Sequence, residues 1–231
     1  MKPNPTRSAF ILIDMENGFI DPASAHCIQG ARATVPACAR ALAAARRKGI
    51  PVFFVKRMYR ADGSDVELTR HAAWQSGGRA MRPASTGATG ADVPRELAPQ
   101  PGDYTIIKPR WSAFFGTELD LILRRLDVRT VILAGTTTPN CVRTSCYDAN
   151  ALDYNVVVVE DCCSSATDEI QRTNIDDMRR MGAVIISEAE FEDYDEHTVP
   201  DLAQAIRAQM LSSDDAPEPF DVHPAGWPDL W

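Results

Sequence analysis

The chain has 231 residues, 45% of them hydrophobic, which is enough for one large domain with a buried core. Its formal net charge of −8 and its pI of about 5.0 argue against nucleic acid or an anionic membrane as a partner. No apolar run is long enough to cross a bilayer, and the N-terminal residues lack a signal-peptide pattern. The six cysteines include no CxxC pair and no zinc spacing, so we expect reduced thiols in a cytoplasmic protein.

Apolar runs alternate with helical periodicity along most of the chain. In chain order, the pattern predicts a strand at 9–14, a helix at 31–48, strands at 50–55 and 104–108, a helix at 117–126, a strand at 128–134, a helix beginning near Cys141, a strand at 155–160, a helix at 168–181, a strand at 183–186 and a helix at 200–211. A loop is expected at 15–22. Residues 61–103 are the least regular part, and a connection this long often serves as a lid or a binding loop.

The alternation of strands and helices predicts an α/β fold. We expect a three-layer, doubly wound, Rossmann-like structure, with a mostly parallel sheet of about six strands and helices on both faces. Residues 1–211 are assigned to a single domain. Residues 212–231 are assigned to a C-terminal tail rich in Pro and Asp, which we expect to pack late or to swap to a neighbouring molecule.

Three chemically matched side chains fall at ends of predicted strands, namely Asp14, Lys108 and Cys141. Right-handed crossovers bring these strand ends to one edge of the sheet. Taken alone, a cysteine after a strand is more often a small buried residue, and a lone Asp is more often a helix cap. Together, the three favour a nucleophilic Cys141 whose thiolate is stabilised by a helix start and by Lys108. Asp14 is then the predicted base, since no histidine lies at a predicted strand end.

Three segments, in this order, resemble motifs of the isochorismatase-like cysteine hydrolases. They are FILIDMENGF at 10–19, IKPRWSAF at 107–114 and GTTTPNCV at 135–142. The resemblance extends over about 8–190 and implies that Asp14, Lys108 and Cys141 form a catalytic triad. It also implies a non-proline cis peptide just before Thr137, and an oxyanion hole made by the backbone amides of Thr137 and Cys141.

The predicted chemistry is hydrolysis of a C–N bond in a small amide, ureide or carbamoyl compound through a cysteine thioester. Relatives implied by the resemblance include nicotinamidases, N-carbamoylsarcosine and ureidoacrylate amidohydrolases, and isochorismatases. Nicotinamidases carry an Asp-x-His metal site after the second strand, whereas residues 56–62 of this chain contain no histidine. We therefore expect neither nicotinamide as the substrate nor a bound metal, and no other cofactor.

Four side chains near these motifs are candidates for substrate binding. Phe19 and Trp111 either wall the pocket or pack in the core. Arg57 and Arg60 follow the second predicted strand and lie either in a solvated loop or on a rim that binds a substrate carboxylate or ureido oxygen.

Three alternatives remain open from the sequence. Isochorismatase-type vinyl-ether hydrolysis is disfavoured because those relatives lack the nucleophilic cysteine. A catalytically silent member that serves as a binding or assembly subunit is disfavoured because all three triad residues are present. A dinucleotide enzyme is disfavoured because no GxGxxG follows the first predicted strand. The resemblance further implies a homodimer or a homotetramer.

Overall fold

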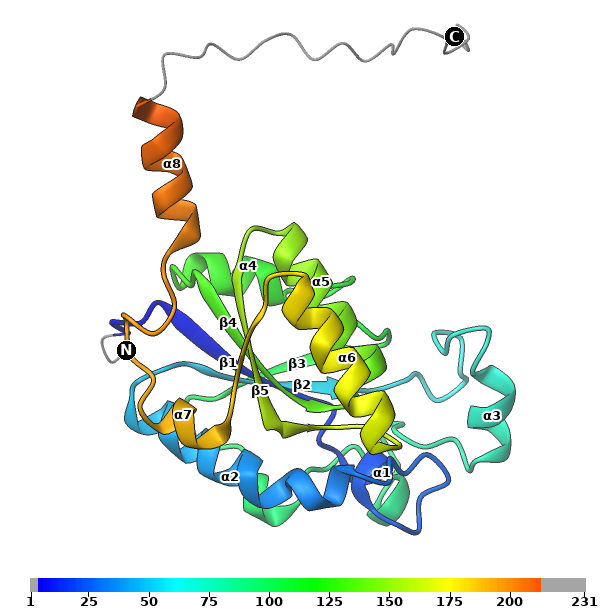
Figure 1. Cartoon of the computed structure of the whole chain (residues 1–231). Coiled ribbons are helices and arrows are strands. Elements are labelled where there is room, and N and C mark those ends of the chain that lie inside the picture. Colours follow the sequence, from blue (N-terminus) through cyan, green and yellow to red (C-terminus); the bar gives the residue numbers. More distant parts are fainter. Residues whose placement is uncertain (1–3, 213–231) are drawn as a thin grey trace, which may run out of the picture. The chain divides into compact units, whose positions relative to one another are not determined.

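A six-stranded sheet forms the centre of the protein (Figure 1). The computed structural model describes residues 4–212. The strands are β1 Ser8–Ile13, β2 Val52–Arg57, β3 Tyr104–Lys108, β4 Thr130–Thr136, β5 Asn155–Ser164 and β6 Val184–Ile186. All of them pair in parallel, in the order β3-β2-β1-β4-β5-β6, which confirms the predicted doubly wound α/β fold.

Helices cover both faces of the sheet (Figure 1). The helices are α1 Asn17–Ile20, α2 Ala31–Arg47, α3 His71–Ser76, α4 Leu119–Arg125, α5 Arg143–Ala151, α6 Asp168–Arg180, α7 Glu188–Glu192 and α8 Leu202–Ser212. Helices α2 and α7 share one apolar core with the sheet, and α4, α5 and α6 share the other. The compact unit that holds the sheet ends at Asp201, and α8 belongs to a second unit. The predicted tail at 213–231 lies outside the described residues.

The central strands are apolar without interruption because both of their faces are covered. Phe10 and Leu12 of β1 pack into the core beneath α2, whereas Ile11 and Ile13 pack into the core beneath α5. Alternate side chains of a strand point to opposite faces, so a strand between two helical layers needs an apolar residue at every position. This places β1 and β4 at the centre of the sheet, where every residue of both strands is buried.

Several elements differ in extent from the sequence-based prediction. Strand β2 continues to Arg57 because it pairs with β3 as far as Arg57 and Lys108. Strand β5 continues to Ser164 because an irregularity in its pairing with β4 brings Cys163 opposite Gly135. The predicted loop at 15–22 contains the short helix α1. In both strands a pairing partner distant in sequence extends the element.

The order of the strands creates a crevice at one edge of the sheet. Strand β1 lies between β2 and β4, so the chain turns to one side after β1 and to the other side after β4. In doubly wound sheets, binding sites form at this point, beyond the carboxyl ends of the two strands. Asp14 follows β1 there, and Cys141 follows β4.

The close contact between β1 and β4 at this edge depends on Gly135. Its φ is +118°, and an added Cβ would lie 2.0 Å from the carbonyl oxygen of Ile13. Any side chain at this position would therefore push the two strands apart where they reach the crevice.

Gly135→Ala should lower the free energy of unfolding by at least about 3 kcal/mol, because the new methyl group meets backbone atoms that have no room to move. Gly102→Ala is the matched control, since Gly102 has a φ of +100° but no atom within 4 Å of an added Cβ. Backbone strain alone should cost the control about 1 to 2 kcal/mol. Urea unfolding measures both values, and equal losses would contradict the role given to the contact with Ile13.

Candidate active site

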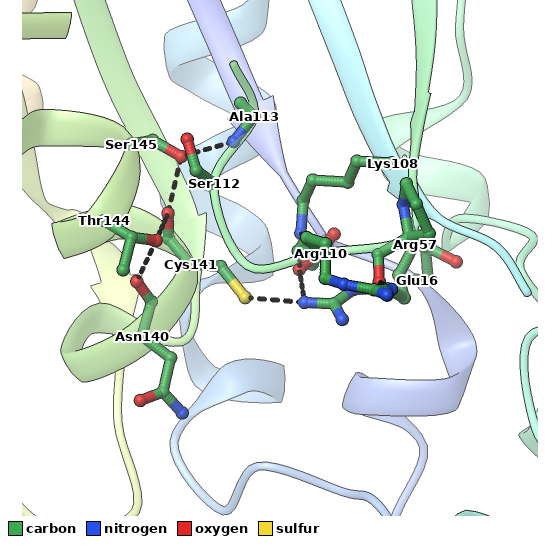
Figure 2. Close-up of polar contacts among 12 residues, drawn as sticks. Glu16, Arg57, Lys108, Arg110, Ser112, Ala113, Asn140, Cys141, Thr144 and Ser145 are labelled. Atoms are coloured by element: carbon green, nitrogen blue, oxygen red, sulfur yellow. Dashed lines mark hydrogen bonds and ion pairs between the residues drawn. The ribbon is translucent and has the colours of Figure 1, made fainter. Parts of the chain in front are cut away.

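Four side chains from four neighbouring strands converge at the crevice. Asp14 follows β1, Arg57 ends β2, Lys108 ends β3 and Cys141 follows β4. Arg57 and Lys108 are 0% exposed, Asp14 is 1% exposed and Cys141 is 4% exposed. In Figure 2 a dashed line joins Arg57 to the sulphur of Cys141, and the Lys108 side chain lies nearby. The structure thus brings together the three predicted triad residues and adds an arginine that the sequence analysis assigned to the substrate.

Asp14 and Lys108 form a buried ion pair. The Nζ of Lys108 donates hydrogen bonds to Asp14 Oδ2 at 2.7 Å and to the carbonyl oxygen of Arg110 at 3.0 Å. Asp14 adopts a φ of +52°, a conformation that Asp tolerates better than most residues, while its N–H still donates to Val55 of β2. This turn aims the carboxylate into the crevice. No group within residues 4–212 hydrogen-bonds Asp14 Oδ1, which leaves one oxygen able to accept a proton.

Arg57 contacts the sulphur of Cys141 directly. Its Nη2 donates to Cys141 Sγ at 3.4 Å and lies 3.9 Å from Asp14 Oδ2 (Figure 2). Its Nη1 donates to Tyr59 Oη at 2.8 Å and to Glu67 Oε1 at 2.5 Å. Burial disfavours the charge, but the facing groups, above all Cys141 and Asp14, outweigh burial and raise the Arg57 pKa well above its usual value. The guanidinium therefore stays charged out of contact with water.

The turn that carries Cys141 is fixed by hydroxyl groups. Thr138–Val142 forms a single π-helical turn before α5. Ser145 Oγ donates to the carbonyl oxygen of Cys141 at 2.6 Å (Figure 2). Thr138 Oγ1 donates to the carbonyl oxygen of Ser164 in β5 at 3.0 Å. The peptide bond between Thr136 and Thr137 is cis. The oxyanion role of the Thr137 and Cys141 amides remains a prediction.

Burial disfavours the thiolate form of Cys141. Burial raises the Cys141 pKa first, Asp14 raises it further, and Lys108 and Arg57 oppose this rise without cancelling it. Lys108 therefore favours the thiolate, as the sequence analysis expected, but burial of the sulphur opposes it more strongly. Desolvation decides the direction, and the burial of this sulphur is not visible in the sequence. The acceptor for the thiol proton is then Asp14, whose Oδ1 has no hydrogen-bond partner in the described part of the chain.

Glu16 is a buried carboxyl group that the sequence analysis missed. Its Oε1 accepts the backbone N–H of Arg57, and its Oε2 has no partner among the described residues. Burial, and then the charge of Asp14, raise the Glu16 pKa well above the usual range. Asp14 and Glu67 are then the carboxylates that balance the charges of Arg57 and Lys108. The only hint in the sequence was an acidic residue two positions after a strand-end Asp.

The other predicted substrate residues lie in different settings. Phe19 is buried in a small cluster with Tyr59 and Trp74, and these three help to line a cavity of about 50 Å³. Trp111 is 39% exposed. The Arg60 residue is exposed, and its backbone N–H donates to Asp65. The structure therefore brings only Arg57 of the four into contact with the nucleophile, and the substrate roles of the others remain predictions.

A metal has no evident place in this site. Within residues 4–212, no three side chains of His, Cys, Asp or Glu gather where they could hold a metal ion. The end of β2, where nicotinamidases were expected to carry an Asp-x-His site, instead holds Arg57 and its partners Tyr59 and Glu67. The residues present therefore do not fit that metal.

Comparison with known proteins identifies the family. A family model described as the isochorismatase domain matches residues 8–190. The chain belongs to the isochorismatase family. Ureidoacrylate amidohydrolase RutB of Pantoea ananatis is 33% identical over 180 residues, covering 71% of this chain and 72% of the relative. A protein of Arabidopsis thaliana named "Probable inactive nicotinamidase" is 39% identical over 177 residues, covering 76% of this chain and 89% of the relative.

Solved structures of isochorismatase-family proteins share the fold. The family protein from Desulfovibrio vulgaris is 42% identical with a TM-score of 0.77, covering 81% of this chain and 97% of that one. The N-carbamoylsarcosine amidase of Thermoplasma acidophilum is 29% identical with a TM-score of 0.66, covering 78% of this chain and 96% of that one. The chain is thus an isochorismatase-family hydrolase with amidohydrolase relatives, which confirms the resemblance seen in the sequence. Among its described residues, no helix is long and apolar enough to span a membrane.

Glu16 gives this isochorismatase-family site a testable pH dependence. Since folding raises the Glu16 pKa, the stability contributed by this carboxyl is complete below the ordinary glutamate pKa of about 4.3 and is lost as pH rises toward the folded value. Glu16→Gln cannot ionise, so its unfolding free energy relative to wild type should increase from about pH 4.5 to about pH 8. Urea unfolding across this range measures the difference.

Glu96→Gln is the control, because Glu96 is exposed. Its unfolding free energy relative to wild type should not change with pH in the same way. If Glu16→Gln behaves like this control, Glu16 is ionised in the folded protein and the charge balance described above is wrong.

Proposed function

We propose that this protein is a cysteine hydrolase that cleaves the C–N bond of a small amide, ureide or carbamoyl compound, with Asp14, Lys108 and Cys141 as its catalytic triad. The observation that carries the proposal is the setting of Cys141 Sγ. The sulphur lies at the switch point of the sheet, in a site that also holds a carboxylate with an unpaired oxygen and two buried cations. These are the groups that nucleophilic attack on a carbonyl needs.

The first half-reaction forms a thioester. Asp14 takes the proton of the Cys141 thiol as the sulphur attacks the carbonyl carbon, and the carbonyl oxygen gains the negative charge. Backbone N–H groups of Thr137 and Cys141 are the proposed donors to that oxyanion. When the tetrahedral intermediate collapses, the C–N bond breaks and Asp14 returns the proton to the leaving nitrogen, so that ammonia or an amine departs.

The second half-reaction hydrolyses the thioester. Asp14 is again ionised and removes a proton from a water molecule, which attacks the thioester carbonyl. The C–S bond breaks, the acid product leaves, and the proton returns to the Cys141 sulphur. Lys108 holds Asp14 in place during both steps through the hydrogen bond from its Nζ. No step requires a metal-activated water.

The names of the relatives support this class of substrate. Ureidoacrylate amidohydrolase and N-carbamoylsarcosine amidase are both named for C–N hydrolysis of small ureido or carbamoyl compounds. One relative is named a probable inactive nicotinamidase, and residues 56–62 of this chain, after the second strand, contain no Asp-x-His. A silent binding subunit is the rival function, favoured by the burial of the Cys141 thiol, which raises its pKa, and by the name of that relative. Turnover on any amide or ureide excludes this rival.

Cys141→Ala should abolish ammonia release on whichever amide, ureide or carbamoyl compound a screen of wild type identifies, because the covalent intermediate cannot form. Cys146→Ala is the matched control. Cys146 is buried one helical turn further on, and its thiol has a pKa raised to about 12 by burial, so it should not act as a nucleophile. Mass spectrometry of quenched wild type should find an acyl group on Cys141. An active Cys141→Ala would refute the mechanism.

Asp14→Asn and Lys108→Ala should each lower kcat by at least about a hundredfold, the usual scale for losing a proton acceptor or a preorganised charge. Asp193→Asn, an exposed residue, should retain wild-type turnover. Circular dichroism checks that each variant is folded. Near-normal turnover in a folded Asp14→Asn would mean that another group takes the thiol proton.

A further inference from the structure

Arg57 is placed to act on the nucleophile rather than on the substrate. Its Nη2 lies 3.4 Å from Cys141 Sγ, within hydrogen-bonding distance of sulphur, and the guanidinium is fully buried. Sequence analysis offered Arg57 as a ligand for a substrate carboxylate, which would need a pair of free N–H groups along one edge. Nη1 is already engaged by Tyr59 and Glu67, and Nη2 by the sulphur, whereas the buried Nε has no hydrogen-bond partner among the described residues.

We propose that Arg57 is a fourth catalytic residue, which stabilises the Cys141 thiolate each time it forms, and that Tyr59 and Glu67 are positioning residues that hold the guanidinium against the sulphur. The thiolate forms when Asp14 removes the thiol proton and again when the C–S bond of the thioester breaks. Arg57 keeps its own protons throughout and donates a hydrogen bond to the sulphur anion. The role of Arg57 during turnover rests on the proposed function, whereas its contact with the Cys141 sulphur is independent of that function.

The surroundings of the sulphur explain why such a group is needed. The ionisable groups facing Cys141 are Asp14 after β1, Arg57 of β2 and Lys108 of β3, with Glu16 and Glu67 behind them. Lys108 is hydrogen-bonded to Asp14 and to a backbone carbonyl, and no hydrogen bond joins it to the sulphur among the contacts of the described residues. A buried thiolate beside a carboxylate therefore depends on Arg57, the cationic side chain that donates a hydrogen bond to the sulphur.

The positioning residues come from the irregular segment after β2. Glu67 Oε1 accepts from Arg57 Nη1, and Glu67 Oε2 accepts from Tyr59 Oη at 2.7 Å. Tyr59 Oη also accepts from Arg57 Nη1, which closes a ring of three hydrogen bonds around one nitrogen. Burial opposes ionisation of Glu67, but Arg57 and the hydrogen bond from Tyr59 outweigh it and lower the Glu67 pKa. The ring leaves Nη2 as the end of the guanidinium that points to the sulphur.

The test is the pKa of the Cys141 thiol, which needs no substrate. It is obtained from the ultraviolet absorbance of the thiolate during a pH titration, as the difference between each variant and the same variant carrying Cys141→Ser. Arg57→Met combined with Glu67→Gln removes the cation without leaving a buried carboxylate unpaired. We expect the double variant to raise the thiol pKa by about 1 to 3 pH units, the usual effect of losing an opposite charge at this distance.

Two further variants separate the roles. Glu67→Asp keeps the charge but shortens the side chain, so a raised thiol pKa would identify Glu67 as a positioning residue. Arg46→Met is the matched control, because Arg46 also pairs with a largely buried carboxylate, Asp103, at 2.6 Å but does not contact the site. The Cys141 thiol of the Arg46→Met variant should have the same pKa as that of wild type.

The results distinguish this inference from the proposed function. An unchanged thiol pKa in a folded Arg57→Met/Glu67→Gln variant, with KM raised and kcat retained, would overturn the inference and return Arg57 to substrate binding. A raised thiol pKa supports the inference even if the substrate screen finds no turnover. With a substrate in hand, we expect kcat of the double variant to fall at least about tenfold, in step with the lost thiolate.

Discussion

The buried ion pair between Asp14 and Lys108 is the interaction on which the site depends. Removing two charges from water is costly, and the attraction between them offsets the cost only when the geometry is good. Here the 2.7 Å hydrogen bond is held by two strands that are not neighbours, since Lys108 of β3 reaches past the end of β2 to the residue after β1. Sheet order therefore decides which charges can meet, and the rigidity of three paired strands holds them together.

Arg57 fits into this arrangement because β2 ends between the two partners. Its side chain brings a second cation into the same dry space, and Glu67 supplies the second anion. Burial and the charge of Asp14 raise the Glu16 pKa well above its usual range, so a third ionised carboxylate is disfavoured here. The Cys141 pKa is raised for the same reason. Burial disfavours the thiolate, and the charge of Asp14 repels it until Asp14 accepts the thiol proton and becomes neutral.

Much of this architecture could be predicted from local sequence. The apolar runs that end in Asp14 and Lys108, and the turn before Cys141, indicated the doubly wound fold, the family and the residues at the crevice. Arg57 was expected after the second strand, not as its last residue, and was not expected to be buried, because a charged residue after an apolar run normally marks a loop. Glu67 and Glu16 acquire their importance only through Arg57, which lies 10 and 41 positions away. Local patterns carry no information about such partners, nor about the desolvation that sets a pKa.

The hydrogen bonds that join residues 59–67 to Arg57 have a consequence for how this family could be diversified. A long loop beside an active site is usually regarded as an exchangeable module, in which new substrate preferences arise while the catalytic groups stay as they were. In this protein the same loop contains Tyr59 and Glu67, which orient the Arg57 guanidinium on the Cys141 sulphur. The backbone carbonyl of Asp65 also accepts a hydrogen bond from Arg110, close to Lys108. Loop grafting between relatives would therefore transfer reactivity together with selectivity. Chimaeras designed from this scaffold should carry Arg57, Tyr59 and Glu67 as one inherited unit.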